Sequence, residues 1–213
     1  MNVITRRAAL ALATSSALLA GCISVGIGNS ESNLQVQYRL EDLAPPPPPA
    51  KRTVPRSLIV AAMPSIGIGD SFSMAYSKSA QERALYHYAS WAERPSNRIV
   101  QLLTRRIETR GAFASVAELG RGVGGDLALN VTVDELVHDT AGARGRLQLT
   151  AELVDRSTRT LVARRSFQAS APVAQEDARG AVDALSRALT TVLDELVPWL
   201  ETVADKLPAS ASR

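Results

Sequence analysis

The chain has little of the chemistry on which enzymes and disulfide-stabilised domains depend. Its 213 residues contain one cysteine and two histidines, and 4% are aromatic. A single cysteine cannot form an intramolecular disulfide. Neither a Gly-x-Ser-x-Gly or His-Glu-x-x-His motif nor a P-loop lysine occurs, and His87 and His138 are too isolated to suggest a metal site. We therefore expect no enzyme activity, no bound metal and no cofactor.

Three carboxylates come closest to a catalytic pattern. Asp134, Glu135 and Asp139 lie near the end of an expected strand, and a pair of carboxylates can act as general acid and base. A solvated strand end explains the cluster more simply, so we assign no catalytic residue.

Charge and hydropathy exclude two further classes. The formal net charge is +3, and 22 basic and 21 acidic residues remain once the two arginines of the N-terminal leader are removed. No dense basic patch with interleaved aromatic residues occurs, so we expect no nucleic-acid partner. After residue 21 no stretch reaches 18 apolar residues. We therefore expect that the mature chain does not span a membrane.

The N-terminus, in contrast, carries a processing signal. Arg6 and Arg7 precede about thirteen mostly apolar residues at 8–20, which is the length of a secretory h-region. The following Leu-Ala-Gly-Cys resembles the box at which bacterial lipoproteins are acylated and cleaved. We predict a signal peptide over residues 1–21, cleavage between Gly21 and Cys22, and a lipid such as palmitate on Cys22.

Two alternatives to the lipoprotein signal remain. One is an ordinary secretory peptide with a chance cysteine beside the cut, and the other is a cytosolic protein with an apolar first helix. The paired arginines also fit part of a twin-arginine signal, although general secretion is favoured.

Ile23 stands where an aspartate would favour the inner membrane, which points to the periplasmic face of the outer membrane. Small and polar residues over 22–33 are typical of a flexible tether.

A proline run separates the first two expected strands. Alternating apolar residues over 34–40 are typical of a half-buried strand, and 58–62 of a short buried one. Pro45–Pro49 favours polyproline II. We interpret it as a stiff connector, the alternative being a ligand for a proline-binding module. A hairpin is expected over residues 72–89.

Two helices are expected. Pro95 is typical of a first helical turn, and apolar residues from Ile99 to Ile107 share one face before a C-cap at Gly111. A second apolar stripe with helical spacing runs over 175–197, where Pro198 should bend or end the helix.

Three further strands complete the predicted fold. Alternation over 127–133 and 147–153, followed by a turn at 155–159 and a returning strand, predicts a meander. The glycine-rich loop Gly120–Gly125 precedes a strand, so we interpret it as a connector and not as a nucleotide-binding loop. We predict an α+β, two-layer domain over 34–207, with a largely antiparallel sheet, two main helices on one face, and a disordered tail over 208–213.

One segment resembles a known family. Tyr88, Trp91, Ala92 and Pro95, followed by the amphipathic helix, resemble the signature of ABC-type transport auxiliary lipoproteins, the PqiC/YmbA-like family. The resemblance covers nearly the whole mature chain. The signature residues are interpreted as core aromatics at the hairpin-to-helix corner, the alternative being residues that bind a partner.

The resemblance implies a non-enzymatic role beside an inner-membrane ABC transporter. The implied partner is a periplasmic protein with MCE (MlaD-like) domains, in systems that move lipids between the two membranes and support envelope integrity. A ring-like homo-oligomer would suit such a cylindrical assembly. The alternatives are a structural envelope lipoprotein and a stand-alone periplasmic lipid carrier.

Overall fold

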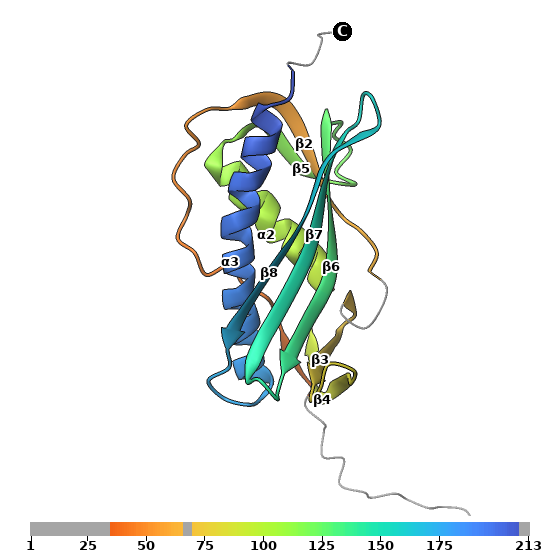
Figure 1. The fold of residues 1–213 in the computed structure, drawn as a ribbon, viewed down its shortest axis with the longest axis vertical. Helices are drawn as coiled ribbons and strands as arrows, with labels where there is room; N and C mark the ends of the chain where they lie inside the picture. Colours follow the sequence, from red (N-terminus) through yellow and green to blue (C-terminus); the bar gives the residue numbers. More distant parts are fainter. Residues whose placement is uncertain (1–34, 66–69, 209–213) are drawn as a thin grey trace, which may run out of the picture. The chain divides into compact units, whose positions relative to one another are not determined.

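The computed structural model describes residues 35–65 and 70–208. The predicted signal peptide, Cys22, the tether and residues 209–213 of the predicted tail lie outside the described residues. One mixed sheet of eight strands carries two helices on one face (Figure 1), which confirms the predicted α+β class with two layers. In chain order the elements are β1 (Val36–Tyr38), β2 (Val54–Ala62), β3 (Ser73–Ser77), β4 (Ala84–Trp91), α2 (Pro95–Arg110), β5 (Phe113–Glu118), β6 (Leu127–Asp139), β7 (Arg144–Asp155), β8 (Thr160–Pro172) and α3 (Ala178–Asp205).

The strand β6 organises the sheet. One of its edges pairs with β7 from Leu127 to Asp139, and β7 pairs in turn with β8, both antiparallel, as the alternating pattern predicts. Its other edge is shared, because β2 pairs with residues 127–131 and β3 with the last two residues, both in parallel. The sheet therefore has two wings beside β6. One wing is β2 with β5, and the other is β3 with β4 and β1.

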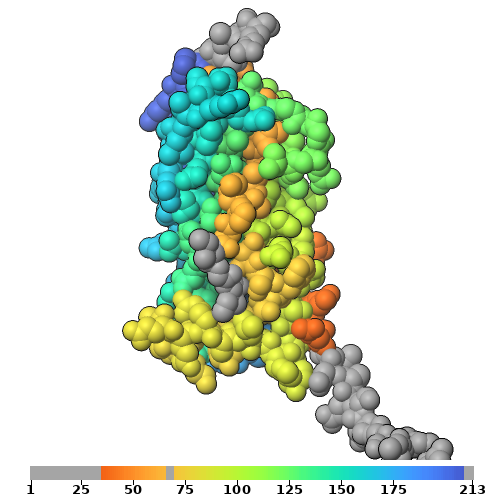
Figure 2. Space-filling model, turned by 90° about the vertical axis from the view of Figure 1, so that its right-hand side faces the viewer, coloured from red at the N-terminus to blue at the C-terminus, as the bar shows by residue number. Residues whose placement is uncertain are grey.

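The two wings define two ends of the described chain. We call the end near Asp139 the hairpin end; it carries the β3–β4 turn at 78–83 and the connections at 140–143 and 173–177. We call the end near Leu127 the loop end; it carries the β5–β6 loop at 119–126 and the β7–β8 turn at 156–159. Figure 2 shows the hairpin in yellow at one end, and the β7–β8 turn in cyan and the β5–β6 loop in green at the other.

The helix α2 begins and ends as the sequence predicts. Pro95 occupies its first turn, where backbone N–H groups have no partner within the helix, so the N–H that proline lacks is not needed. Gly111 closes it in the left-handed conformation with φ of 64°, and its N–H donates to the carbonyls of Ile107 and Glu108. The inward face of the helix includes Ile99 and Leu103, both fully buried against the sheet.

The helix α3 extends further than predicted. It continues through Pro198 to Asp205, so of the two expected outcomes, a bend or an end of the helix, the end is wrong. Tertiary packing explains the difference, because Leu196 and Leu200 are fully buried on either side of the proline, which is itself exposed. At the other end Asp177 is the N-cap, and its carboxylate accepts from the N–H of Gly180 at 2.7 Å.

The glycine-rich segment Gly120–Gly125 is a connector, as predicted. It leaves β5, passes across β2 and enters β6, since β5 and β6 pair with opposite edges of β2. Gly125 lies directly on Ile59 of β2, and a Cβ at this position would stand 2.6 Å from Ile59 Cγ1. Gly120 and Gly122 have φ of 93° and 72°, which favour glycine. Backbone conformation therefore accounts for Gly120 and Gly122, and close approach accounts for Gly125.

Candidate functional site

The signature residues Tyr88, Trp91 and Pro95 do not form one cluster. Trp91 is 3% exposed and belongs to the hydrophobic core, and Pro95 is buried at the start of α2. Tyr88 is 57% exposed on β4, so its interpretation as a core aromatic is wrong. Burial favours a packing role for Trp91 and Pro95, whereas the ring of Tyr88 is open to a partner.

The exposure of Tyr88 has a local cause in the pairing of β3 with β4. Ser73 pairs with Ser90 and Ala75 with Leu85, so residues 86–89 of β4 lie opposite a single residue of β3. Such a bulge bends a strand and redirects its side chains. The rings of the exposed residues His87 and Tyr88 meet edge to face here, with centroids 4.6 Å apart.

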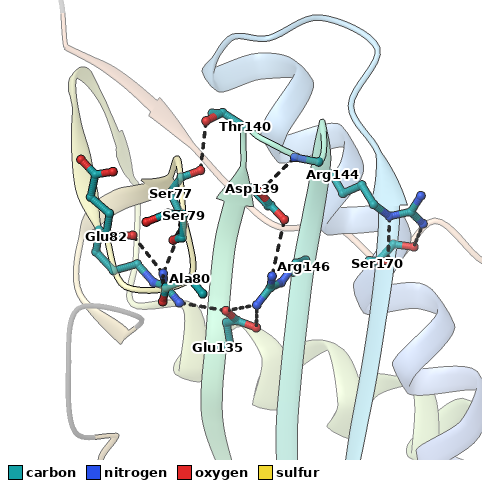
Figure 3. Close-up of polar contacts among 12 residues, drawn as sticks. Ser77, Ser79, Ala80, Glu82, Glu135, Asp139, Thr140, Arg144, Arg146 and Ser170 are labelled. Carbon is teal, nitrogen blue, oxygen red and sulfur yellow. Dashed lines mark hydrogen bonds and ion pairs between the residues drawn. The ribbon is translucent and has the colours of Figure 1, made fainter.

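Arginines and carboxylates fasten the β3–β4 hairpin to β6 and β7 (Figure 3). Arg83 of the hairpin donates to Glu135 of β6 at 3.1 Å, and Arg146 of β7 donates to both oxygens of Glu135 at 2.7 and 2.9 Å. Arg146 also donates to Asp139 at 3.4 Å. The hydrogen bond to Glu135 raises the pKa of Arg146. This charged network holds the hairpin end together.

The interpretation of Asp134, Glu135 and Asp139 as a solvated strand end holds for Asp134, which is exposed, and needs correction for Glu135 and Asp139. Asp134 accepts from the hydroxyl of Thr150 at 2.6 Å, and the side chains of Glu135 and Asp139 are each 21% exposed while they bind Arg146. Glu135 and Asp139 share Arg146 as a partner and Asp134 is bonded to Thr150, so the three carboxylates are held by structural contacts and do not converge on one cavity as a general acid and base would.

A second buried polar contact joins β4 to β6 at the hairpin end. Tyr86 Oη lies 2.6 Å from Nδ1 of His138, which is fully buried at the end of β6. Burial raises the pKa of Tyr86 to about 12, and burial lowers the pKa of His138 despite the nearby Glu176 and Asp139. Nε2 of His138 has no hydrogen-bond partner among the described residues. The imidazole is therefore held neutral at pH 7.

The outer face of the meander, opposite the helices, is built from rows of paired residues. Paired residues of antiparallel strands point to the same face of a sheet. One row, at the loop end, is apolar, and Ala128, Val154 and Leu161 form it. The next rows toward the hairpin end are polar; they are Asn130–Glu152–Arg164 and Thr132–Thr150–Ser166, followed by the Gln148–Gln168 pair. A hollow of about 390 Å³ over Arg146, Gln148 and Ser170 marks the polar part.

The apolar row opens into a groove at the loop end. A cavity of about 620 Å³ is lined by the β7–β8 turn with Arg156 and Arg159, by Val154, and by Gly125 and Asp126 of the β5–β6 loop. Arg156 donates to the carbonyl of Gly125 at 2.9 Å, which joins the two segments.

The carboxylates at the loop end turn inward. Asp126 accepts from the N–H and hydroxyl of Ser57, both at 2.8 Å, and these bonds lower its pKa. Asp155 accepts from the hydroxyl of Ser157 at 2.6 Å and from buried Arg56 at 2.9 Å, which hold its pKa well below the usual range. Both carboxylates are therefore bonded within the fold, and neither forms an ion pair with Arg156 or Arg159.

The proline run lies between β1 and β2, which is the connector position that the sequence predicts. Arg110 of α2 donates to the carbonyl of Pro48 at 3.2 Å and pairs with Glu201 of α3. Nearby, Arg106 is 5% exposed and is bonded to Asp42 and Asp194. A cavity of about 300 Å³ lies between the prolines and both helices. The run thus straps the segment before β2 onto the helical layer.

This arrangement can bind and position other molecules. Within residues 35–65 and 70–208, no three His, Cys, Asp or Glu side chains are placed to hold a metal ion. The same residues include no helix that is long and apolar enough to cross a membrane. The sequence pattern located the turn at 155–159 but gave no reason to single out Arg156 and Arg159. These arginines lie beside an apolar row that includes Leu161, and this row is formed only by the register between strands.

A family model described as the ABC-type transport auxiliary lipoprotein component matches residues 38–197. No curated protein matches the sequence. Among solved structures, protein XCC0632 from Xanthomonas campestris, of the DUF330 family, is 28% identical, with 80% of this chain and 95% of that chain covered and a TM-score of 0.68.

A second solved structure, of an uncharacterised protein, is 15% identical, with 70% of this chain and 96% of that chain covered and a TM-score of 0.58. At this identity the likeness concerns the fold alone.

Proposed function

Since this chain belongs to the family of ABC-type transport auxiliary lipoprotein components, we propose that it is anchored at the periplasmic face of the outer membrane by a lipid on Cys22. It serves there as a non-enzymatic component of an MCE/Mla-like system that moves lipids between the inner and outer membranes. The single observation that carries the proposal is the family match over residues 38–197, which spans the sheet and most of both helices.

The polar chemistry of the described residues supports a role in binding. The charged groups with the lowest exposure are engaged with internal partners, as Arg106 is with Asp42 and Arg56 is with Asp155. A buried charge that is fully paired holds a fold together and is not free to react. The exposed side chains include the aromatic ring of Tyr88 at the hairpin end and the apolar and basic groups at the loop end.

The anchor is tested by removing the acylation site. Cys22→Ser should abolish incorporation of labelled palmitate and move the protein from the outer-membrane fraction to the soluble periplasm, because no other cysteine exists and lipid chains would supply the membrane affinity. Adding Ser24→Cys to this variant is the matched control, since it restores a thiol outside the box. Unchanged fractionation of Cys22→Ser, or acylation of the control, would contradict the proposal.

The transporter role is tested by binding. The mature protein should retain the purified periplasmic MCE-domain protein from the same organism in a pull-down, and its native mass spectrum gives the number of copies in any homo-oligomer. Failure of the two folded proteins to associate would contradict this role. Phospholipid found on the isolated protein would favour the stand-alone carrier instead.

A further inference from the structure

The loop end carries an apolar row beside exposed arginines. Leu161 is 56% exposed, and Val154 next to it lines the groove of about 620 Å³. Val123 on the β5–β6 loop is also 56% exposed. Single exposed apolar residues are common on protein surfaces, but a row that continues into a groove is typical of a binding surface.

The exposed charge around this groove has one sign. In the β5–β6 loop and the β7–β8 turn, the exposed charged side chains are Arg121, Arg156 and Arg159. Among the described residues, Arg156 and Arg159 form no ion pair, and Arg121 lies 3.8 Å from Glu118. Asp126 also lines the groove but is bonded to Ser57 and forms no ion pair with these arginines, so an acidic ligand can pair with the guanidinium groups of Arg156 and Arg159.

The backbone at Arg159 is an independent observation. Its φ is 59°, in the left-handed region where glycine is the unstrained choice. The turn therefore keeps an arginine at a position where glycine would fit the backbone better. A strained residue beside a groove is a reason to examine its side chain for function.

The loop end lies away from the point at which the described chain begins. The described chain begins at Gln35, just before β1, which belongs to the hairpin wing. Twelve residues separate Gln35 from Cys22. The 13-residue strand β6 spans roughly 40 Å between the two ends. A chain anchored at Cys22 thus enters the fold at the hairpin end, and the loop end lies at the opposite end of β6 from that entry point.

We propose that the loop-end surface, formed by Val154, Leu161, Arg156 and Arg159, docks an acidic segment with apolar side chains from a periplasmic protein of the transporter. This inference rests on the proposed function, because it takes the hairpin end to be the membrane side. The apolar row seats the segment's apolar side chains, and the arginines bind its carboxylates.

The inference is tested with paired substitutions at the two ends. Leu161→Ser with Arg159→Glu removes one exposed apolar group and reverses one charge at the loop end. Leu85→Ser with Arg144→Glu makes the same changes at the hairpin end, where Leu85 is 47% exposed and Arg144 is exposed. Binding of each purified mature protein to the immobilised periplasmic MCE-domain protein is measured, together with its thermal unfolding.

We expect the loop-end pair to lose at least tenfold in affinity and the hairpin-end pair to stay within about twofold of wild type. Equal affinities would overturn the docking surface while leaving the transporter role intact, whereas no binding by wild type would overturn both. Loss of binding to phosphatidylglycerol vesicles by the loop-end pair, with protein binding retained, would assign the surface to a membrane and overturn the inference.

Arg159→Gly separates docking from folding. It should raise the melting temperature, because it relieves the left-handed backbone, and it should still weaken binding at least threefold, because it removes the charge. A gain in stability with unchanged affinity would show that the arginine has no part in docking and would overturn the inference.

Discussion

The hairpin end and the loop end of β6 use arginine in different ways. At the hairpin end Arg83 and Arg146 both bind Glu135, and these ion pairs join the β3–β4 wing to the meander. At the loop end Arg156 and Arg159 form no ion pair with any described residue. Charges satisfied within the fold contribute to stability, and charges left unpaired on a groove are available to a partner.

The difference extends to the exposed charges of the two ends. Exposed residues of both signs alternate at the hairpin end, among them Lys78, Glu82 and Asp177. In the two loop-end segments the exposed charges are all arginines, because Asp126 and Asp155 are turned inward. We therefore expect substitutions at the hairpin end to change stability, and substitutions at the loop end to change binding.

The largest effect should come from the core of the hairpin wing. Trp91→Ala should lower the free energy of unfolding by about 3–5 kcal/mol, because it leaves a cavity under a residue that is 3% exposed. Tyr88→Ala, three residues earlier and 57% exposed, should change it by less than about 0.5 kcal/mol. Urea unfolding measures both. Similar losses for the two variants would remove the distinction between packing and exposed signature residues.

The network at the hairpin end should give the next largest effect. Glu135→Ala should cost about 1–2 kcal/mol, since it leaves Arg83 and Arg146 without their shared carboxylate at a site that is 21% exposed. Glu152→Ala is the control, because its contact with Arg164 is 3.5 Å long and Arg164 is 63% exposed. That variant should stay within about 0.5 kcal/mol of wild type. Equal costs would mean that the network adds nothing beyond a surface ion pair.

Acid should weaken the hairpin end before the loop end. Burial lowers the pKa of His138 in the folded protein, so the unfolded chain takes up a proton first as the pH falls below about 6.5. The stability is fully present above that pH and should fall by up to about 1.4 kcal/mol per pH unit below it.

The loop-end carboxylates behave in the same sense, but at a lower pH. The lowered pKa values of Asp126 and Asp155 keep their contribution intact until the pH drops below about 4. Urea unfolding at pH 7.5 and 5.5 tests the difference, with His138→Gln as the variant that should flatten the slope and His87→Gln as its control. A slope that persists in His138→Gln would assign it to another group.

The smallest effect should be a gain at the loop end. Arg159→Gly should stabilise the protein by about 0.5–1 kcal/mol, since glycine adopts a φ of 59° without strain. Arg156→Gly should destabilise it instead, because Arg156 has no such φ and donates to the carbonyl of Gly125. Thermal unfolding distinguishes the two. A loss of stability in Arg159→Gly would mean that the arginine side chain contributes to folding.

Local signals in the sequence predicted the parts of the fold that depend on neighbouring residues. Pro95 and Gly111 marked the ends of α2, and alternation marked the three strands of the meander. The end of α3 was not predictable in this way, because burial of Leu200 beyond Pro198 depends on tertiary packing. The strand β5 gave no clear alternation, since its residues Ala114 and Ser115 are both exposed at a sheet edge.

The alternation of apolar and polar residues could not predict which strands pair with each other. Alternation indicates that a strand has two faces, but it does not say which strand lies beside it or in which direction. The parallel pairing of β2 with both β5 and β6 could therefore not be predicted. The loop-end groove could not be predicted for the same reason, because Val154 and Leu161 are neighbours only through the register of β7 and β8. Cys22 and the signature could be named from sequence, and the docking surface could not.

The central place of β2 has a consequence for how the chain folds. Both strands that flank β2 come from later in the sequence, and about seventy residues separate Leu58 from its partner Leu127. Pairing between distant residues slows folding, because the intervening chain must be ordered first. A growing chain that stops short of β6 leaves the buried side chains of β2 without one neighbour, so it cannot complete its sheet. Late closure of this kind keeps a newly made polypeptide open for longer.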